Sequence, residues 1–184
     1  MVRLDEYDNK SYHCGRGILV QSLWFFIGLP ILRCQLNPFS GLKCWLLRLF
    51  GAKIGTGVVI KPGVRVKYPW KLSIGDHTWI GEDVWIDNLA QVTIGSHVCI
   101  SQAAYLCTGN HDWKDPKFRL MTSEIEIAEG AWVGAKAIVC PGVKMAKLSI
   151  LIAGSVAAAS LPETDIQVGN PATFRAKRII HQAQ

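Results

Sequence analysis

An aliphatic residue recurs every six positions from residue 54 onward, and this repeat constrains the fold more than any other feature of the sequence. The fourteen positions of the series are Ile54, Ile60, Val66, Ile74, Ile80, Ile86, Ile94, Ile100, Leu106, Ile127, Val133, Val139, Met145 and Leu151. A series of this length with no exception does not arise by chance. The residues from 54 to 151 therefore form a repeat structure.

Each six-residue unit carries a second inward position, because the fourth residue after the aliphatic one is mostly small or β-branched. Two inward positions in six residues do not fit a helix, but they fit a short strand followed by a turn. Three such units close a triangular coil, and stacked coils share one core. Successive triplets begin at Ile54, Ile74 and Ile94, 20 residues apart, so two extra residues bulge at one corner, near residues 69–70 and 89–92.

One polar insertion, residues 107–126, interrupts the repeat between Leu106 and Ile127. A long loop on a solenoid is seldom retained for stability, so function is expected there. The sequence thus predicts an all-β solenoid domain over residues 52–184, with a C-terminal tail over residues 160–184. An apolar and partly helical segment, residues 1–51, precedes it.

Within that first segment, residues 18–32 form the longest apolar stretch, and they are too few to cross a bilayer of about 30 Å. The stretch either packs on the protein or a neighbouring subunit, or lies in a membrane surface. A helix is predicted over residues 41–50 and ends at Gly51. Its apolar residues at helical spacing are Leu42, Trp45, Leu46 and Leu49, with Lys43 and Arg48 off that face.

The charge and the cysteine spacing of the chain exclude some classes of function. The 184 residues carry a formal charge of +6, but no run of five or six basic residues occurs, so a nucleic-acid partner is not predicted. The surplus charge instead suits a phosphate-bearing cofactor or an anionic membrane face. The six cysteines form no metal-binding or redox spacing and are expected to be reduced and mostly buried. The polar, acidic opening favours a cytoplasmic protein, with peripheral contact at the inner membrane face as an open possibility.

The repeat, the insertion motif TGNHDW and the later motifs CPGV and GNPA resemble the hexapeptide-repeat acyltransferases. The pattern is most similar to the colanic-acid biosynthesis acetyltransferase branch, and more distantly to the galactoside, maltose and nodulation-factor acetyltransferases. The resemblance implies a left-handed parallel β-helix. It also implies acetyl-CoA as donor, no metal, and a homotrimer whose active sites lie between subunits.

The same resemblance implies roles for individual residues. His111 matches the general base, which takes the proton of an alcohol as that alcohol attacks a thioester. Asp87 and Asn88 interrupt the coil before the insertion and match acceptor-contacting positions. Asp83 and Asp112 are weaker candidates for that role.

The expected cofactor residues are Trp132, which matches an aromatic near the cofactor arm, and Ala135 and Ala153, whose backbone would bind pantetheine. The sequence departs from the family pattern at Ala158-Ala159, where many relatives have a Thr-Lys pair, and at Thr173, where a Lys or Arg is usual. The nearby cations Arg175, Lys177 and Arg178 are candidates to replace those basic residues.

We therefore expect an acetyl-CoA-dependent O-acetyltransferase that acts on a sugar or polysaccharide precursor, with direct transfer assisted by His111. Two alternatives stay open at this point. One is a non-catalytic β-helix that acts as a scaffold or sugar-binding module. The other is a zinc-dependent β-helix carbonic anhydrase, for which His77, His97 and His111 would have to converge on one metal. Nucleotidyl transfer is not expected, because no glycine-rich phosphate loop occurs.

Overall fold

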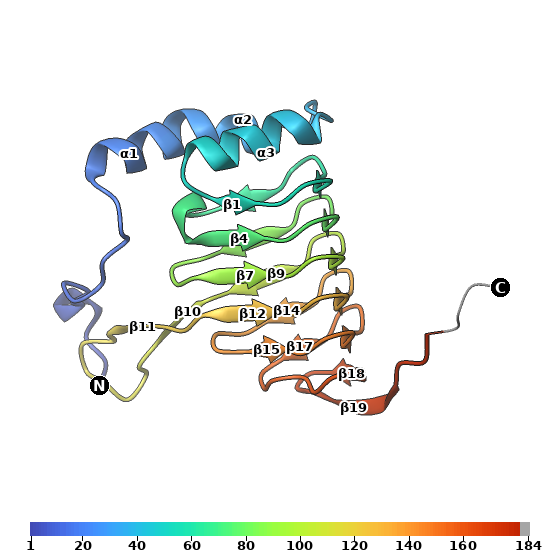
Figure 1. Cartoon of the computed structure of the whole chain (residues 1–184). Helices are drawn as coiled ribbons and strands as arrows, with labels where there is room; N and C mark the ends of the chain where they lie inside the picture. The colour runs from blue at the N-terminus through green and yellow to red at the C-terminus, as the bar shows by residue number, and fades with distance from the viewer. Residues whose placement is uncertain (181–184) are drawn as a thin grey trace.

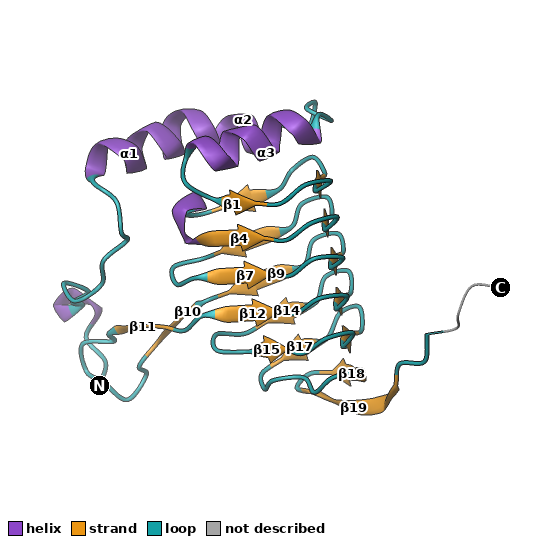
Figure 2. Ribbon diagram, viewed as in Figure 1, coloured by secondary structure: helices purple, strands orange, loops and turns teal. Residues whose placement is uncertain are grey.

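The computed structural model describes residues 1–180, so the last four residues of the expected C-terminal tail lie outside the described part. The chain forms a left-handed parallel β-helix with helices across one end (Figures 1 and 2). Its cross-section is triangular, with three parallel sheets that we call faces A, B and C. Each coil contributes one strand to each face, and we name the corners AB, BC and CA by the faces that they join.

The strands of the five complete coils stack in sequence order. Face A contains β1 (Lys53–Ile54), β4 (Leu72–Ile74), β7 (Val92–Ile94), β12 (Ile125–Ile127) and β15 (Lys144–Met145). Face B contains β2 (Val59–Ile60), β5 (Trp79–Ile80), β8 (Cys99–Ile100), β13 (Trp132–Val133) and β16 (Ile150–Leu151). Face C contains β3 (Arg65–Val66), β6 (Trp85–Asp87), β9 (Tyr105–Cys107), β14 (Ile138–Val139) and β17 (Val156–Ala157).

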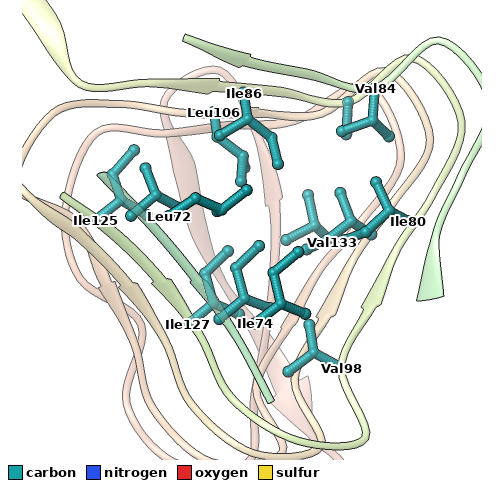
Figure 3. Close-up of a cluster of buried hydrophobic side chains, with 14 of the residues drawn as sticks. Leu72, Ile74, Ile80, Val84, Ile86, Val98, Leu106, Ile125, Ile127 and Val133 are labelled. Atoms are coloured by element: carbon teal, nitrogen blue, oxygen red, sulfur yellow. The ribbon is translucent and has the colours of Figure 1, made fainter. Parts of the chain in front are cut away.

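The hexad series forms the core of this prism, as the sequence predicts (Figure 3). Thirteen of the fourteen positions are at most 4% exposed, and Ile54, in the edge strand β1, is half-buried. Each of these residues pairs with its counterpart in the next coil; on face A, for example, Ile54 pairs with Ile74 and Ile74 with Ile94. The expected corner bulge is the short helix η3 (Pro69–Lys71) at corner CA.

The turns between strands bring successive coils very close together. Non-glycine residues adopt left-handed backbone angles at several corners, including His77 and His97 at AB and Asp83 at BC. At Gly134 a Cβ atom would lie 2.3 Å from the backbone nitrogen of Ala153 in the next coil. Glycine is required there because no side chain fits between the two coils.

The sequence-based role of Asn88 in substrate contact is wrong, because this residue is fully buried. Its Oδ1 accepts a hydrogen bond from the backbone N–H of Tyr68 at 3.0 Å. Its Nδ2 donates to the carbonyls of Tyr68 at 2.6 Å and Lys71 at 2.9 Å. The amide therefore joins two coils where the bulge at corner CA interrupts the regular ladder.

Helices cover the open end of the first coil. The segment from α1 (Ile18–Leu23) through η2 (Trp24–Gly28) to α2 (Leu29–Arg33) crosses that end beside α3 (Ser40–Leu49) (Figure 1). We call these helices the cap. The predicted helix and its stop at Gly51 are confirmed, but the apolar line does not mark the packed face of α3. Leu46 is buried, whereas Leu42, Trp45 and Leu49 are exposed and Lys43, Cys44 and Leu47 pack inward.

The cap packs polar groups inward because they bond to the edge strands of the first coil. Ser40 Oγ and Lys43 Nζ donate to the carbonyl of Ile60 at 3.1 and 3.3 Å. Trp24 Nε1 donates to the carbonyl of Val66 at 3.1 Å, and Arg48 donates to the carbonyl of Ile54. Burial lowers the pKa of the Lys43 ammonium. Each strand of the first coil thus has a carbonyl paired with a side chain of the cap.

The remaining elements flank the solenoid. β18 (Asp165–Gly169) adds to face B and pairs antiparallel with β19 (Ala172–Lys177) at the far end. The arm before the cap contains η1 (Leu4–Glu6), and the insertion contains β10 (Gly109–His111) and β11 (Leu120–Thr122). The six cysteines are free thiols; only Cys44 is fully buried, fewer than the sequence predicts. Within residues 1–180, none of the helices has the length and apolarity that a membrane crossing requires.

The buried position of Asn88 gives a stability prediction. Replacing it by alanine leaves the Tyr68 N–H and the Lys71 carbonyl without partners, while the Tyr68 carbonyl keeps its bond from the Lys71 N–H. Asn88→Ala should therefore lower the free energy of unfolding by about 2–4 kcal/mol. Asp83→Asn is the control, because asparagine tolerates the left-handed backbone angle of this exposed position, whose side chain makes one hydrogen bond, with Gln35. It should change the free energy of unfolding by less than about 1 kcal/mol. Urea unfolding of the three proteins measures both. Equal losses for the two variants would contradict the structural role of Asn88.

Candidate active site

The insertion forms an antiparallel hairpin that leaves the solenoid at corner CA and returns there. β10 pairs with β11 so that His111 lies opposite Leu120. The residues between the strands form the tip, where Asp115 and Arg119 make an ion pair. His111 lies at the end of β10 and is half-buried. The hairpin therefore holds this imidazole away from the body of the prism.

The contacts of His111 determine which ring nitrogen carries the proton. Nδ1 lies 2.9 Å from the backbone carbonyl oxygen of Phe118. A carbonyl only accepts hydrogen bonds, so the neutral ring carries its proton on Nδ1 and leaves the lone pair of Nε2 free. The Phe118 ring stacks on the imidazole, with 4.4 Å between centroids and 4° between planes. The imidazole is thus fixed in orientation, with Nε2 able to accept a proton.

Phe118 reaches this position through an unusual backbone. Its φ angle is 49°, in the left-handed region that aromatic residues rarely adopt. Local strain of this kind concentrates at functional sites. Sequence reasoning missed Phe118 because its contribution includes a backbone carbonyl, which no residue type encodes.

A second contact that the sequence does not predict comes from the N-terminal arm. The ring of Tyr7 lies edge-on to His111, with 5.7 Å between centroids, and the N–H of Arg3 donates to the carbonyl of Pro116 at 2.8 Å. Tyr12 Oη donates to the carbonyl of Leu89 at 2.9 Å, at corner CA. The arm therefore lies along the hairpin and the neighbouring corner.

Asp87 lies at the end of β6, one coil before the hairpin. Its Oδ2 accepts a hydrogen bond from Tyr105 Oη at 3.1 Å, and Oδ1 lies 3.2 Å from Lys67 Nζ. Burial raises the pKa of the Tyr105 phenol, so this hydroxyl stays protonated and donates to the carboxylate. The Asp87 side chain keeps 13% of its surface exposed. A partly exposed, oriented carboxylate near corner CA can accept hydrogen bonds from an acceptor's hydroxyl groups.

The other two acidic candidates differ from Asp87. Asp83 lies at corner BC, away from the hairpin, where it is exposed and bonded to Gln35 Nε2 at 2.8 Å. Asp112 follows His111, but its carboxylate accepts the backbone N–H of Lys114 at 3.0 Å and shapes the hairpin tip. Of the predicted acidic contacts, Asp87 has the better position for a bound acceptor.

The expected cofactor residues meet in a groove of about 500 Å³ along face B. Trp132, Ala135 and Ala153 all line it, together with Gly134 and Ile166. The indole Nε1 of Trp132 donates to Ser101 Oγ at 2.8 Å, which fixes the ring across one end. The groove is mainly apolar and bordered by small residues, so an extended ligand can approach the backbone closely.

The cations near this groove are not equivalent. Lys177 pairs with Asp165, and Arg178 donates to the carbonyls of Gly130 and Leu148. Arg175, on β19, is exposed, and its side chain makes no hydrogen bond or ion pair with residues 1–180. The Arg175 guanidinium is therefore available to an anionic ligand on this face, as is the exposed Lys136 beside Ala135.

The candidate residues do not all meet within one chain. His111 and Asp87 lie near corner CA, whereas Trp132, Ala135 and Ala153 lie along face B and corner BC. The faces of a triangular prism point in different directions, so the groove and the hairpin of one chain do not open toward each other.

The histidines of the zinc alternative are also separated. His77 and His97 stack at corner AB, with 5.4 Å between ring centroids, while His111 is on the hairpin at corner CA. Among residues 1–180, no three His, Cys, Asp or Glu side chains gather in a metal-binding arrangement. The three-histidine site therefore does not form within a chain.

No protein-family profile matches the chain. The chain is 40% identical over 170 residues to the Escherichia coli (strain K12) protein named "Putative colanic acid biosynthesis acetyltransferase WcaF", covering 92% of this chain and 93% of that one. It is 32% identical over 127 residues to nodulation protein L of Rhizobium meliloti (strain 1021), covering 67% of this chain and 69% of the relative.

Solved structures show the same architecture. A hexapeptide-repeat acetyltransferase of Vibrio cholerae superposes with a TM-score of 0.78 at 23% identity, over 86% of this chain and 90% of that one. A galactoside acetyltransferase in complex with coenzyme A superposes with a TM-score of 0.69 at 22% identity, over 82% of each chain. These two likenesses establish the fold, and the 40% relative extends the relationship over nearly the whole sequence. The chain therefore belongs to the hexapeptide-repeat acetyltransferase family.

Proposed function

We propose that this protein is an O-acetyltransferase that moves acetyl from acetyl-CoA to a hydroxyl group of a sugar or polysaccharide precursor. The observation that carries the proposal is the Nδ1 contact of His111 with the Phe118 carbonyl, which leaves Nε2 free to act as a base. The relative named for colanic acid biosynthesis supports a polysaccharide precursor as the acceptor class.

The transfer step is direct. Nε2 of His111 removes the proton from the acceptor hydroxyl as its oxygen attacks the thioester carbonyl carbon. A backbone N–H stabilises the negative charge that develops on the carbonyl oxygen. The attack gives a tetrahedral intermediate. Its collapse breaks the carbon–sulfur bond, and the thiolate of coenzyme A receives the proton from the imidazolium. The products are the acetyl ester and free coenzyme A, with His111 returned to its neutral form.

The groove on face B is the proposed donor site. The pantetheine arm would lie along Ala135 and Ala153, with Trp132 beside it, and Arg175 would pair with a phosphate of coenzyme A. Arg175 would then supply charge that the sequence lacks at Ala158-Ala159 and Thr173. Asp87 would accept hydrogen bonds from acceptor hydroxyl groups near corner CA.

The complete site then requires two copies of the chain. The hairpin and the groove face different directions in one copy. When a second copy is rotated relative to the first, the hairpin of one would face the groove of the other. We therefore infer a homotrimer with its axis along the solenoid, in which corner CA of each copy would lie beside face B of the next and three equivalent sites would form.

The first prediction concerns the proton on His111. In the neutral ring, the proton should occupy Nδ1, because Phe118 offers an acceptor to that nitrogen alone. Nitrogen-15 NMR of labelled protein distinguishes the two tautomers, and the exposed His13 is an internal reference without this contact. A neutral His111 protonated on Nε2 would exclude this nitrogen as the base.

The second prediction concerns catalysis. His111→Ala should lower acceptor-dependent release of coenzyme A thiol by about 10²-fold or more, since it removes the general base. His77→Asn is the matched control and should retain nearly full activity, because that imidazole is exposed at corner AB, away from the hairpin and the groove, and asparagine tolerates its left-handed backbone angle. Thiol release measured with a panel of sugars and sugar nucleotides tests both variants. Release that is unaffected by loss of His111 would favour a different catalytic centre, and absence of any release would favour the scaffold or sugar-binding alternative.

The third prediction concerns the shared site. Ala153→Trp should block the groove, since this position is exposed and lines it, and should be inactive alone, as should His111→Ala. Co-expressed in equal amounts, the two variants should recover about one quarter of wild-type activity, because half of the hairpins and half of the grooves are intact. A site within one chain would give no recovery in the mixture.

A further inference from the structure

The cap is apolar on its outer side as well as on its inner side. Trp24, Gly28 and Leu32 form the buried line of the α1–η2–α2 segment. On the opposite side, Phe26 is 81% and Leu19 71% exposed, and on α3 Trp45 is 56% exposed. We call this outer surface the cap face; its exposed apolar residues are Ile18, Leu19, Leu23, Phe26, Ile27, Ile31, Leu42, Trp45 and Leu49.

Such a surface is unusual for helices that cover a domain. A surface helix normally exposes its polar side, and a helix that is apolar all round is normally buried. A contiguous exposed apolar patch generally marks a binding surface. The helices lie together across the end of the solenoid (Figure 1), and α2 contacts α3. The exposed apolar side chains of the two helical segments are therefore neighbours.

Charge identifies the partner of the cap face. Residues 16–67, which form the cap and the first coil, contain eight Lys and Arg and no Asp or Glu, and one of the eight pairs with Asp87 of the second coil. The rest of the chain has twelve basic and fourteen acidic residues, since the totals are 20 and 14. The basic side chains Arg16, Arg33, Lys53 and Lys61 are exposed around the helices. The end with the apolar surface is thus also the strongly positive end.

We propose that the cap face binds the surface of an anionic lipid bilayer. Aromatic and aliphatic side chains such as Phe26 and Trp45 enter the boundary between headgroups and acyl chains, and the surrounding cations attract anionic headgroups. A second copy of the chain fits this surface less well, because two caps in contact would bring together two strongly positive ends.

The proposed trimer strengthens this attachment, a step that rests on the proposed function. A threefold axis along the solenoid places all three cap faces at the same end of the assembly. Three weak attachments to one bilayer act together, so the trimer binds more tightly than a single cap. The bilayer would then lie at the first coil, and the acetyl-transfer sites along the sides would stay in water.

Vesicle flotation tests the proposal with the full-length protein. The wild type should float with phosphatidylcholine vesicles that contain about one third phosphatidylglycerol, and less with phosphatidylcholine alone or at high salt. Removing two inserted aromatics by Phe26→Ser with Trp45→Ser should lower binding by at least about tenfold. Arg33→Gln should lower binding to anionic vesicles by about fivefold.

The matched control is Ile179→Ser with Ile180→Ser, which removes two exposed apolar side chains near the opposite end and should leave binding unchanged. Thermal unfolding and acetyl transfer to a soluble acceptor should be unchanged in the Phe26 and Trp45 variant, since both side chains lie outside the fold's core and the proposed site. Flotation uses neither acetyl-CoA nor acceptor, so an inactive protein can still bind.

Three outcomes would overturn the proposal. The wild type would remain unbound by anionic vesicles, or the Phe26 and Trp45 variant would bind as well as the wild type. In the third, light scattering without lipid would show that the variant forms a smaller assembly than the wild type, which would assign the cap face to contact between copies of this chain.

Discussion

The hydrogen bonding of each coil to the next, at constant register, is the constraint on which the rest of the molecule depends. Face A shows it most simply, because Ile54, Ile74, Ile94, Ile127 and Met145 lie in one pairing series. The three faces of successive coils must match in width, so each repeat must hold one large and one small residue inside, and extra residues bulge at a corner. An insertion preserves the pairing between coils only where the chain leaves and returns at a corner, as the hairpin does. The pairing of β7 with β12 continues across it.

Because of the same constraint, the hairpin with His111 and the groove on face B point in different directions. A rigid prism holds its side chains at fixed angles, so the histidine of one corner and the groove of another face cannot approach each other by bending. Fixed placement has a benefit, since groups on a rigid scaffold need little reorganisation when a ligand binds. The contact of His111 with Phe118 is one such fixed element. In the proposed trimer, the threefold arrangement of rigid copies brings the hairpin of one copy to the groove of the next.

The parts of the structure that the sequence predicts are those with a regular period. The hexad gives the solenoid, its three faces and its inward residues, and the break in the hexad locates the hairpin. The packed face of α3 was missed, since an apolar line normally faces inward, whereas here Lys43 is buried by its bond to Ile60. The role predicted for Asn88 was wrong because residue type alone does not distinguish a buried amide that bonds only to backbone from an amide that binds a ligand. The Phe118 carbonyl and the approach of Tyr7 to His111 depend on backbone conformation and distant packing, which periodicity does not encode.

The bonds from the cap to the first coil also set the length of the solenoid. A parallel coil with unpaired strand edges can add another coil, from the same chain or from another molecule, and continued addition produces a filament. Arg48, Ser40, Lys43 and Trp24 occupy a carbonyl on each of the three strands at one end. At the other end the antiparallel strand β19 covers β18 on face B, and Leu161 bonds to β15 on face A. These contacts oppose the addition of further coils, so a structure that could in principle grow without limit remains a particle of defined size.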